Sequence, residues 1–190
     1  MNFLEKKILE EAIVLEESIL KVDHFINQQL DIEILRYIGQ QFATHFSDKA
    51  ITKILTVEAS GIAFALATAL NMGDIPVVFA KKGLSKLNSD DYSAVVYSFT
   101  RKQNTNIWVN KKYIKAQDKI LIIDDFLANG SAVSGLIEIG TAAGAQISGI
   151  GIVIEKSFQG GRAVIEEKGY SVFSLARIAS LANNQIVMAE

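Results

Sequence analysis

The sequence predicts an α/β fold in which a mostly parallel sheet is flanked by helices. From Ile51 onward, apolar segments of strand length alternate with segments of helical spacing, which is typical of such a sheet. The run Ile120–Ile123 is apolar without alternation, as expected of a central strand covered on both faces. With 190 residues, of which 49% are hydrophobic, the chain can bury one core without a second domain.

About fifty residues precede the predicted sheet. Phe3–Ala12 is expected to form a short helix, whereas residues 13–29 fit neither a helical nor a strand period, so we expect an irregular hood there. Asp31 is a suitable N-cap for the helix that follows. The apolar positions of that helix keep helical spacing: Leu35, Ile38, Phe42 and Phe46.

The core elements then follow in order. Strands are expected at Ile54–Val57, Val77–Ala80, Ile120–Ile123, Ile147–Ile154 and Tyr170–Leu175, and helices at Gly61–Asn71, at 131–143 and after Gly161. A two-stranded ribbon, Tyr92–Thr100 with Asn106–Val109, is expected to interrupt this alternation. We predict one domain over residues 1–190, with 1–50 as N-terminal helix, hood and first core helix, 51–178 as core sheet and 179–190 as C-terminal extension.

Composition excludes several classes of function. The net charge of -2 lacks the basic excess of a nucleic-acid binder. The absence of cysteine excludes disulfides, thiol nucleophiles and thiolate metal sites. The N-terminus does not resemble a signal peptide, and no apolar run is long enough to span a bilayer. We therefore expect a cytoplasmic protein without a membrane or nucleic-acid partner.

The most informative segment begins at the apolar run Ile120–Ile123. Asp124 and Asp125 follow it, at the sheet edge where open α/β sheets bind ligands, and two carboxylates there can accept hydrogen bonds from the vicinal hydroxyls of ribose. Small residues then lead into a predicted helix, whose N-terminus and loop N–H groups suit a phosphate. This loop is Ala128, Asn129, Gly130, Ser131 and Ala132. Taken alone, the pattern also fits a magnesium site, a phospho-acceptor site or an ordinary turn.

Ile120–Ala132 resembles the 13-residue signature of the type I phosphoribosyltransferases. Other segments are similar to the bacterial xanthine phosphoribosyltransferases: Val57–Ile62, Val95–Thr100, Ile150–Gln159, and Leu20–Asp23 followed by Asn27 and Gln29. The resemblance covers essentially the whole chain and implies the type I phosphoribosyltransferase fold, with an N-terminal hood and a flexible lid ribbon. It also implies transfer of a 5-phosphoribosyl group from 5-phosphoribosyl 1-pyrophosphate (PRPP) to N9 of xanthine, which yields xanthosine 5′-monophosphate (XMP) and pyrophosphate.

The resemblance implies roles for the sugar-phosphate residues. Residues 128–132 hold the 5′-phosphate, and Asp124 and Asp125 face the ribose. Lys81 and Lys82 stabilise the departing pyrophosphate, and the segment from these lysines to Asp91 is expected to be a mobile lid; a solvated charge cluster is the alternative. The pyrophosphate loop is Ala59, Ser60 and Gly61, where an ordinary helix start is the alternative. Glu58 does not fit beside pyrophosphate unless magnesium or a lysine intervenes.

The resemblance also implies how the base is bound and what accompanies it. Lys156 donates to O6 and N7 of an oxopurine, while Leu20, through its backbone, and Asn27 contact the base. Phe158 either stacks on the purine or belongs to the core. Mg²⁺ is expected to arrive with PRPP rather than on protein ligands of its own, and a homodimer is implied. Two rivals stay open: a PRPP-binding purine regulator without catalysis, and a sister enzyme for guanine, hypoxanthine or adenine.

Overall fold

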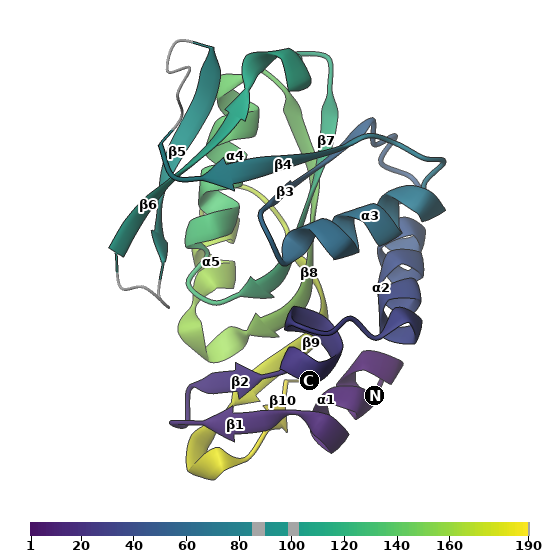
Figure 1. Ribbon diagram of the computed structural model, residues 1–190, viewed down its shortest axis with the longest axis vertical. Helices are drawn as coiled ribbons and strands as arrows, with labels where there is room; N and C mark the ends of the chain where they lie inside the picture. Colours follow the sequence, from purple (N-terminus) through teal and green to yellow (C-terminus); the bar gives the residue numbers. More distant parts are fainter. Residues whose placement is uncertain (85–89, 99–102, 190) are drawn as a thin grey trace.

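A mostly parallel sheet forms the centre of the computed structural model, which describes residues 1–84, 90–98 and 103–189. Within these residues, eight strands lie in the order β10-β9-β8-β7-β3-β4-β6-β5 (Figure 1). The five strands from β9 to β4 run parallel to one another, and the strands at both edges are antiparallel. Their bounds are β3 Lys53–Val57, β4 Val77–Lys82, β5 Asp91–Ser98, β6 Gln103–Asn110, β7 Lys119–Leu127, β8 Gln146–Lys156, β9 Phe173–Ser180 and β10 Val187–Met188. The predicted fold class is confirmed.

Helices cover both faces of the sheet, as the unbroken apolar run predicted (Figure 1). Side chains of neighbouring strand residues point to opposite faces, so Leu121 and Ile123 join one buried cluster and Ile120 and Ile122 the other. The first cluster includes residues of α2 (Ile32–His45) and α3 (Gly61–Asn71). The second includes residues of α4 (Ser131–Ala142) and α5 (Gly161–Glu166). All four residues of the run are fully buried.

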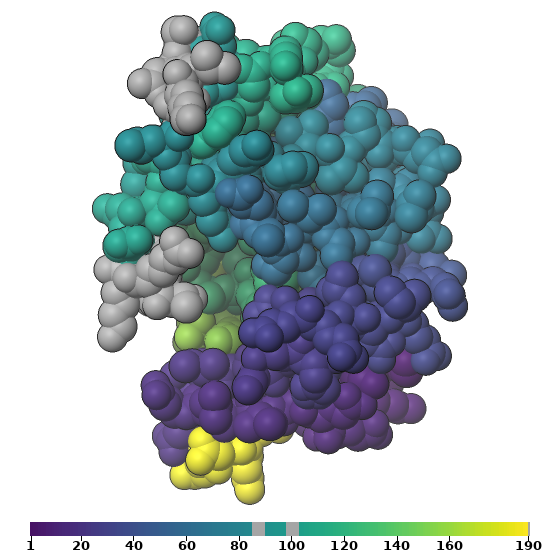
Figure 2. All heavy atoms as spheres, viewed as in Figure 1, coloured from purple at the N-terminus to yellow at the C-terminus, as the bar shows by residue number. Residues whose placement is uncertain are grey.

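The prediction of an irregular hood over residues 13–29 is wrong. This segment forms an antiparallel hairpin, β1 (Ile13–Leu15) and β2 (Ile19–Lys21), and one turn of π-helix, η1 (Asp23–Asn27). Each strand has three residues, which is too short to display a period of two in the sequence. The name hood is kept for residues 13–29. Together with α1 (Phe3–Glu11) it lies beside β9 and β10 at the lower end of the molecule (Figures 1 and 2).

Several predicted boundaries also need correction. β7 does not end at Ile123 but continues through both aspartates, because it pairs with β8 as far as Leu127. The last core strand is not Tyr170–Leu175: the N–H of Tyr170 donates to the carbonyl of Ile165, and the strand begins only at Phe173. Asp31, by contrast, is confirmed as an N-cap, since its Oδ1 accepts the N–H of Glu33 at 2.9 Å.

The predicted ribbon is present but does not interrupt the sheet. β5 and β6 pair with each other, and β6 also pairs with Lys81 and Lys82 of β4, so the ribbon extends the main sheet. Thr100 and the central part of the predicted lid, residues 85–89, lie outside the described residues. In the portion of the chain described here, no helix has the length and apolar character needed to cross a membrane.

Candidate active site

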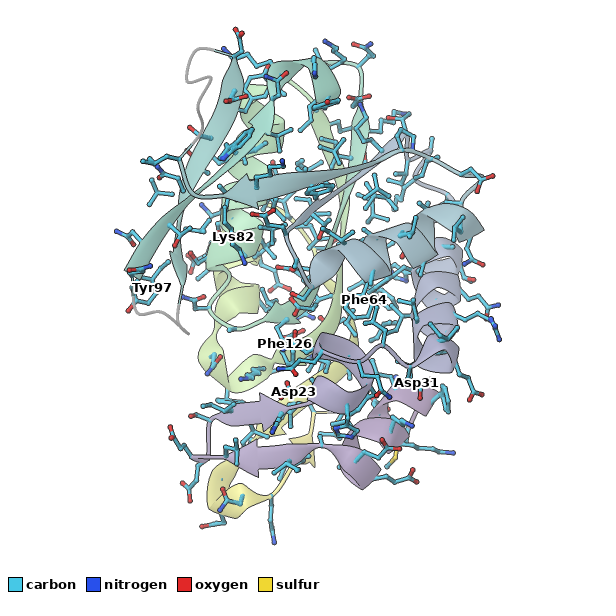
Figure 3. The ribbon with its side chains drawn as sticks, in the orientation of Figure 1. Asp23, Asp31, Phe64, Lys82, Tyr97 and Phe126 are labelled. Atoms are coloured by element: carbon cyan, nitrogen blue, oxygen red, sulfur yellow. The ribbon has the colours of Figure 1, made fainter. Side chains whose placement is uncertain are left out.

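A cavity of about 300 Å³ opens at the carboxyl ends of β3 and β7. Parallel strands end at a common edge, so side chains from distant parts of the sequence meet there. Figure 3 shows three of the lining residues, Lys82, Tyr97 and Phe126, which come from β4, β5 and β7. The lining residues are Val57, Ser60, Lys82, Val96, Tyr97, Thr105, Asp124, Asp125, Phe126 and Ala132.

The two aspartates lie within β7 rather than after it. Asp124 is only 3% exposed, and its Oδ1 accepts the N–H of Asp125 at 3.0 Å. Asp125 is partly exposed, and its Oδ1 accepts the N–H of Phe126 at 2.9 Å. Burial, together with the negative charge of Asp125, raises the pKa of Asp124 well above its ordinary value. The pair therefore combines a buried carboxyl group that holds its proton tightly with an accessible acceptor.

Gly61 allows α3 to pack directly against this acid pair. A Cβ atom at position 61 would overlap Oγ1 of Thr56 and would lie 3.2 Å from Oδ1 of Asp124. Ser60 precedes it and lines the cavity, whereas Ala59 is exposed in the turn that follows β3. Of the three predicted pyrophosphate-loop residues, Ser60 therefore lines the same cavity as the aspartates, and Gly61 packs beside Asp124.

The carboxylate of Glu58, which looked unfavourable beside a pyrophosphate, is bound to a backbone N–H group. Its Oε1 accepts the backbone N–H of Lys82 at 2.6 Å, and its own N–H donates to the carbonyl of Ala80 at 3.0 Å. The peptide bond between Glu58 and Ala59 is cis. The side chain of Glu58 thus joins the turn after β3 to the end of β4, where Lys82 lines the cavity.

The small-residue loop connects β7 to α4 beside the cavity. Gly130 has φ +81°, which favours glycine, and Ser131 is the first residue of α4. Oδ1 of Asn129 accepts the N–H of Ser131 at 3.3 Å, and Oγ of Ser131 accepts the N–H of Tyr97 at 2.7 Å. The carbonyl of Ala128 accepts the N–H of Gly161 at 3.0 Å. A helix N-terminus behind a compact loop is suited to a phosphate.

The two adjacent lysines of β4 do not reach the same site. Lys82 lines the cavity, but Lys81 lines a separate hollow of about 460 Å³, and its Nζ lies 5.9 Å from the centre of the Trp108 ring. Both lysines were expected to follow the strand Val77–Ala80 and to open the polar segment that leads to Asp91. They are instead the last two residues of a strand, where neighbouring side chains point to opposite faces.

Lys156 is the last residue of β8 and lies between Phe126 and the hood. Its Nζ donates to the carbonyl of Ser18 at 2.9 Å and lies 5.7 Å from the centre of the Phe126 ring. Burial lowers the pKa of Lys156. Leu20, one of the predicted base contacts, has a buried side chain in the apolar core, whereas Asn27 is exposed at the end of η1.

Sequence reasoning missed Phe126 as a site residue. It follows the aspartates directly, and its contact with Lys156 puts an aromatic face between the cavity and the base-contacting lysine that was predicted. The available signal was the continuation of β7, since a strand that runs on past Asp125 must turn Phe126 toward one face. Phe158, the aromatic residue that the sequence did suggest, is 42% exposed.

Comparison with known proteins gives one consistent family. No family model matches the chain. It is 51% identical over 191 residues to a xanthine phosphoribosyltransferase of Pseudomonas fluorescens, with all of both chains covered. It is 54% identical over 187 residues to a xanthine phosphoribosyltransferase of Limosilactobacillus reuteri, with 98% of this chain and 97% of the relative covered. Among solved structures, an adenine phosphoribosyltransferase of Rhodothermus marinus has a TM-score of 0.74 at 21% identity, covering 92% of this chain and 98% of that one, which shows a shared fold.

Proposed function

The chain belongs to the xanthine phosphoribosyltransferase family, and we propose that it transfers the 5-phosphoribosyl group of PRPP to N9 of xanthine, with XMP and pyrophosphate as products. One structural observation carries the assignment of the site. The aspartate pair lies in β7 and the small-residue loop follows that strand. Both aspartates line one cavity together with Lys82, Phe126 and Ala132, the last residue of the loop. A ribose phosphate has the size and the groups to match this arrangement.

The proposed roles follow from the chemistry of each group. Asp124 and Asp125 accept hydrogen bonds from the ribose hydroxyls, and the N–H groups of residues 128–132 hold the 5′-phosphate. Ser60 and its neighbours Ala59 and Gly61 face the pyrophosphate. The ammonium group of Lys82 offsets the negative charge that develops as pyrophosphate leaves. We do not assign Lys81 to this step, because it lines a different hollow.

The reaction needs no covalent nucleophile from the protein. C1 of the ribose ionises toward an oxocarbenium-like state as its bond to pyrophosphate breaks, and N9 of xanthine then captures C1. The protein must hold these two atoms at near-attack distance, exclude water and stabilise the leaving group. The rigid β7 and β8 ends position the sugar and the base, so most of the catalytic effect is expected from orientation and charge.

We propose that magnesium reaches this site as a companion of the substrate. No group of three or more His, Cys, Asp or Glu side chains within the described residues is arranged to hold a metal. Asp124 and Asp125 are the carboxylates that line the cavity, and both are assigned to the ribose, so the oxygens of the diphosphate would hold the ion. When bound, magnesium contributes positive charge near the leaving group.

Selection of an oxo base rests on Lys156. An ammonium group has three donors and no acceptor, so it matches O6 and N7 of xanthine but not the amino group of adenine. The ammonium group already donates to a backbone oxygen, the carbonyl of Ser18, and this supports a role as a donor to an oxo group. Leu20, through its backbone, and Asn27 are proposed to contact the base from the hood.

A side-by-side assay tests the proposal. The protein is incubated with magnesium, PRPP and each of xanthine, guanine, hypoxanthine and adenine, and nucleotide and pyrophosphate are measured. Xanthine should be consumed fastest and adenine slowest. A preference for adenine would contradict the role of Lys156, and no pyrophosphate release with any base would favour a binding protein without catalysis.

We further propose that the protein is a homodimer and acts in the cytoplasm, as the resemblance implied. Light scattering of the purified protein tests the first proposal, and a monomer at micromolar concentration would contradict it. Cell fractionation tests the second.

A further inference from the structure

A buried ion pair stands directly behind the base-contacting lysine. Glu155 precedes Lys156 in β8, and its side chain is 1% exposed. Its two oxygens accept from Nε of Arg162 at 2.9 Å and from Nη2 of Arg162 at 2.5 Å, a bidentate arrangement. Oγ of Ser174 donates to this carboxylate at 2.6 Å and Oγ of Ser157 at 3.1 Å, and Nε of Arg177 lies 3.6 Å from Oε2. Glu155 has no direct contact with the cavity described above.

Arg162 connects this carboxylate to the phosphate loop. It is the second residue of α5, and its Nη1 also donates to the carbonyl of Val172 at 2.9 Å. The preceding residue, Gly161, donates its N–H to the carbonyl of Ala128 at 3.0 Å. A Cβ atom on Gly161 would lie 2.5 Å from that carbonyl oxygen and 2.7 Å from the nitrogen of Gly130. The start of α5 is therefore pressed directly against the loop that is proposed to hold the 5′-phosphate.

We propose that the Glu155–Arg162 pair is a positioning element that sets the separation between the purine anchor Lys156 and the 5′-phosphate loop. The inference rests on the proposed function and adds residues that do not touch substrate. A nucleotide must reach both anchors at once, so their separation determines whether N9 and C1 meet at the reacting distance. A displacement of about 1 Å costs as much as 10²-fold in rate.

The chemistry of the pair suits a fixed structural contact rather than a pH-dependent switch. Burial alone would raise the pKa of Glu155, but hydrogen bonds from Arg162 and Ser174 outweigh it and hold the pKa below the ordinary value. The carboxylate thus stays ionised at neutral pH. Two parallel hydrogen bonds from a planar guanidinium also fix orientation as well as distance, which a single bond from lysine does not.

The test compares a ligand that reaches both anchors with one that reaches a single anchor. Calorimetry measures the Kd of XMP and of ribose 5-phosphate for wild type, Arg162→Gln and Arg162→Lys. We expect Arg162→Gln to weaken XMP binding about tenfold or more while ribose 5-phosphate changes less than about twofold. Arg162→Lys keeps the positive charge and the fold but loses the fork, so it should weaken XMP to an intermediate extent. Glu166→Gln is the matched control, because Glu166 also accepts from Arg162, at 3.2 Å, but is half exposed.

A second measurement separates positioning from general damage. In a Lys156→Ala background the anchor is gone, so Arg162→Lys should weaken XMP binding by less than about twofold further. Equal losses for XMP and ribose 5-phosphate, or an equal effect of Arg162→Lys with and without Lys156, would overturn the inference. If the wild type binds XMP but the Arg162 variants lose no more affinity for XMP than for ribose 5-phosphate, only this inference is refuted. Wild-type protein that makes no nucleotide refutes the proposed function itself.

Discussion

The ammonium group of Lys156 donates a hydrogen bond to the carbonyl oxygen of Ser18, 2.9 Å away and 138 residues earlier in the chain. This contact joins the end of β8 to the hairpin of the hood. It places the proposed base anchor between a backbone carbonyl and the face of Phe126. The proposed base site therefore combines segments that lie far apart in the sequence.

Replacing Lys156 by alanine tests its role in choosing the base. Loss of a hydrogen bond from a charged group is expected to cost about 1.5–3 kcal/mol, so kcat/KM for xanthine should fall about 10- to 150-fold. The rate with adenine should change little. Lys21→Ala, on the exposed side of the same hairpin, is the control. An unchanged ratio of xanthine to adenine rates would contradict the assignment.

The two lysines of β4 give a matched pair of variants. Lys82 lines the cavity that contains both aspartates, whereas Lys81 lies over Trp108 in another hollow. We expect Lys82→Ala to lower kcat about 10²-fold, the usual scale for loss of one group that stabilises developing charge, and Lys81→Ala to lower it much less. Steady-state kinetics with saturating PRPP provides the measurement. The prediction fails if Lys81→Ala is the more damaging change in the assay.

The two aspartates should respond differently to replacement by asparagine. Asp125→Asn removes the negative charge and replaces one of the two acceptor oxygens by an NH₂ donor, so it should lower turnover about 10²-fold. Burial and the charge of Asp125 raise the pKa of Asp124 above 3.8, so its stabilising contribution is complete at acid pH and is lost as the pH rises through the raised value. Asp124→Asn cannot ionise, so its free energy of unfolding should fall less than that of wild type as the pH rises above 3.8. Urea denaturation across this range measures the difference, and parallel curves would refute it.

The lowered pKa of Glu155 predicts that the free energy of unfolding depends on pH in the acid range. Burial opposes ionisation of this carboxyl, but Arg162 and Ser174 hold its pKa below 4.5. Its stabilising contribution is therefore present above pH 4.5 and disappears as the pH falls through the lowered value. Glu155→Gln should be less stable than wild type at neutral pH, and the gap should narrow on acidification. Denaturation curves at several pH values test this, with Glu166→Gln as the exposed control. A gap that stays constant or widens would contradict the prediction.

Two glycine-to-alanine substitutions distinguish steric crowding at the proposed phosphate loop from backbone strain elsewhere. Gly161→Ala places a methyl group against backbone atoms of Ala128 and Gly130, so we expect a loss of stability of about 1–3 kcal/mol and weaker binding of ribose 5-phosphate. Gly169→Ala is the control: its φ is +86°, but nothing lies within 4 Å of the added atom. It should lose about 1–2 kcal/mol and keep its affinity. Equal affinity in both variants would argue against contact between α5 and the loop.

Local patterns predicted the parts of the fold that depend on local physics. The apolar run Ile120–Ile123 was correctly read as a strand covered on both faces, and Asp31 as the N-cap of α2. The hairpin in the hood was missed, because strands of three residues carry no visible period. The start of the last core strand was misplaced, because pairing with β8 rather than composition decides where β9 begins.

Some residues of the candidate site were likewise identified from the sequence, and others only from the structure. Asp124, Asp125 and the loop to Ala132 are contiguous, so the sequence alone brought them together, although their binding of ribose phosphate stays a prediction. Phe126 was overlooked, because only the register of β7 against β8 directs it toward Lys156. The sequence alone did not explain a carboxylate beside the proposed pyrophosphate site, because its partner, the N–H of Lys82, lies on another strand.

By itself the sequence determined the class of fold, the family and the residues of the acid pair and loop, because these depend on hydrophobic pattern and on neighbours in the chain. The tertiary structure alone decided that Lys82 rather than Lys81 lines the cavity of the aspartates, that Ser18 contacts Lys156, and that Gly161 contacts Ala128. Strand alternation, sheet register and helix packing set those relations, and each depends on atoms that are distant in sequence and adjacent only after folding.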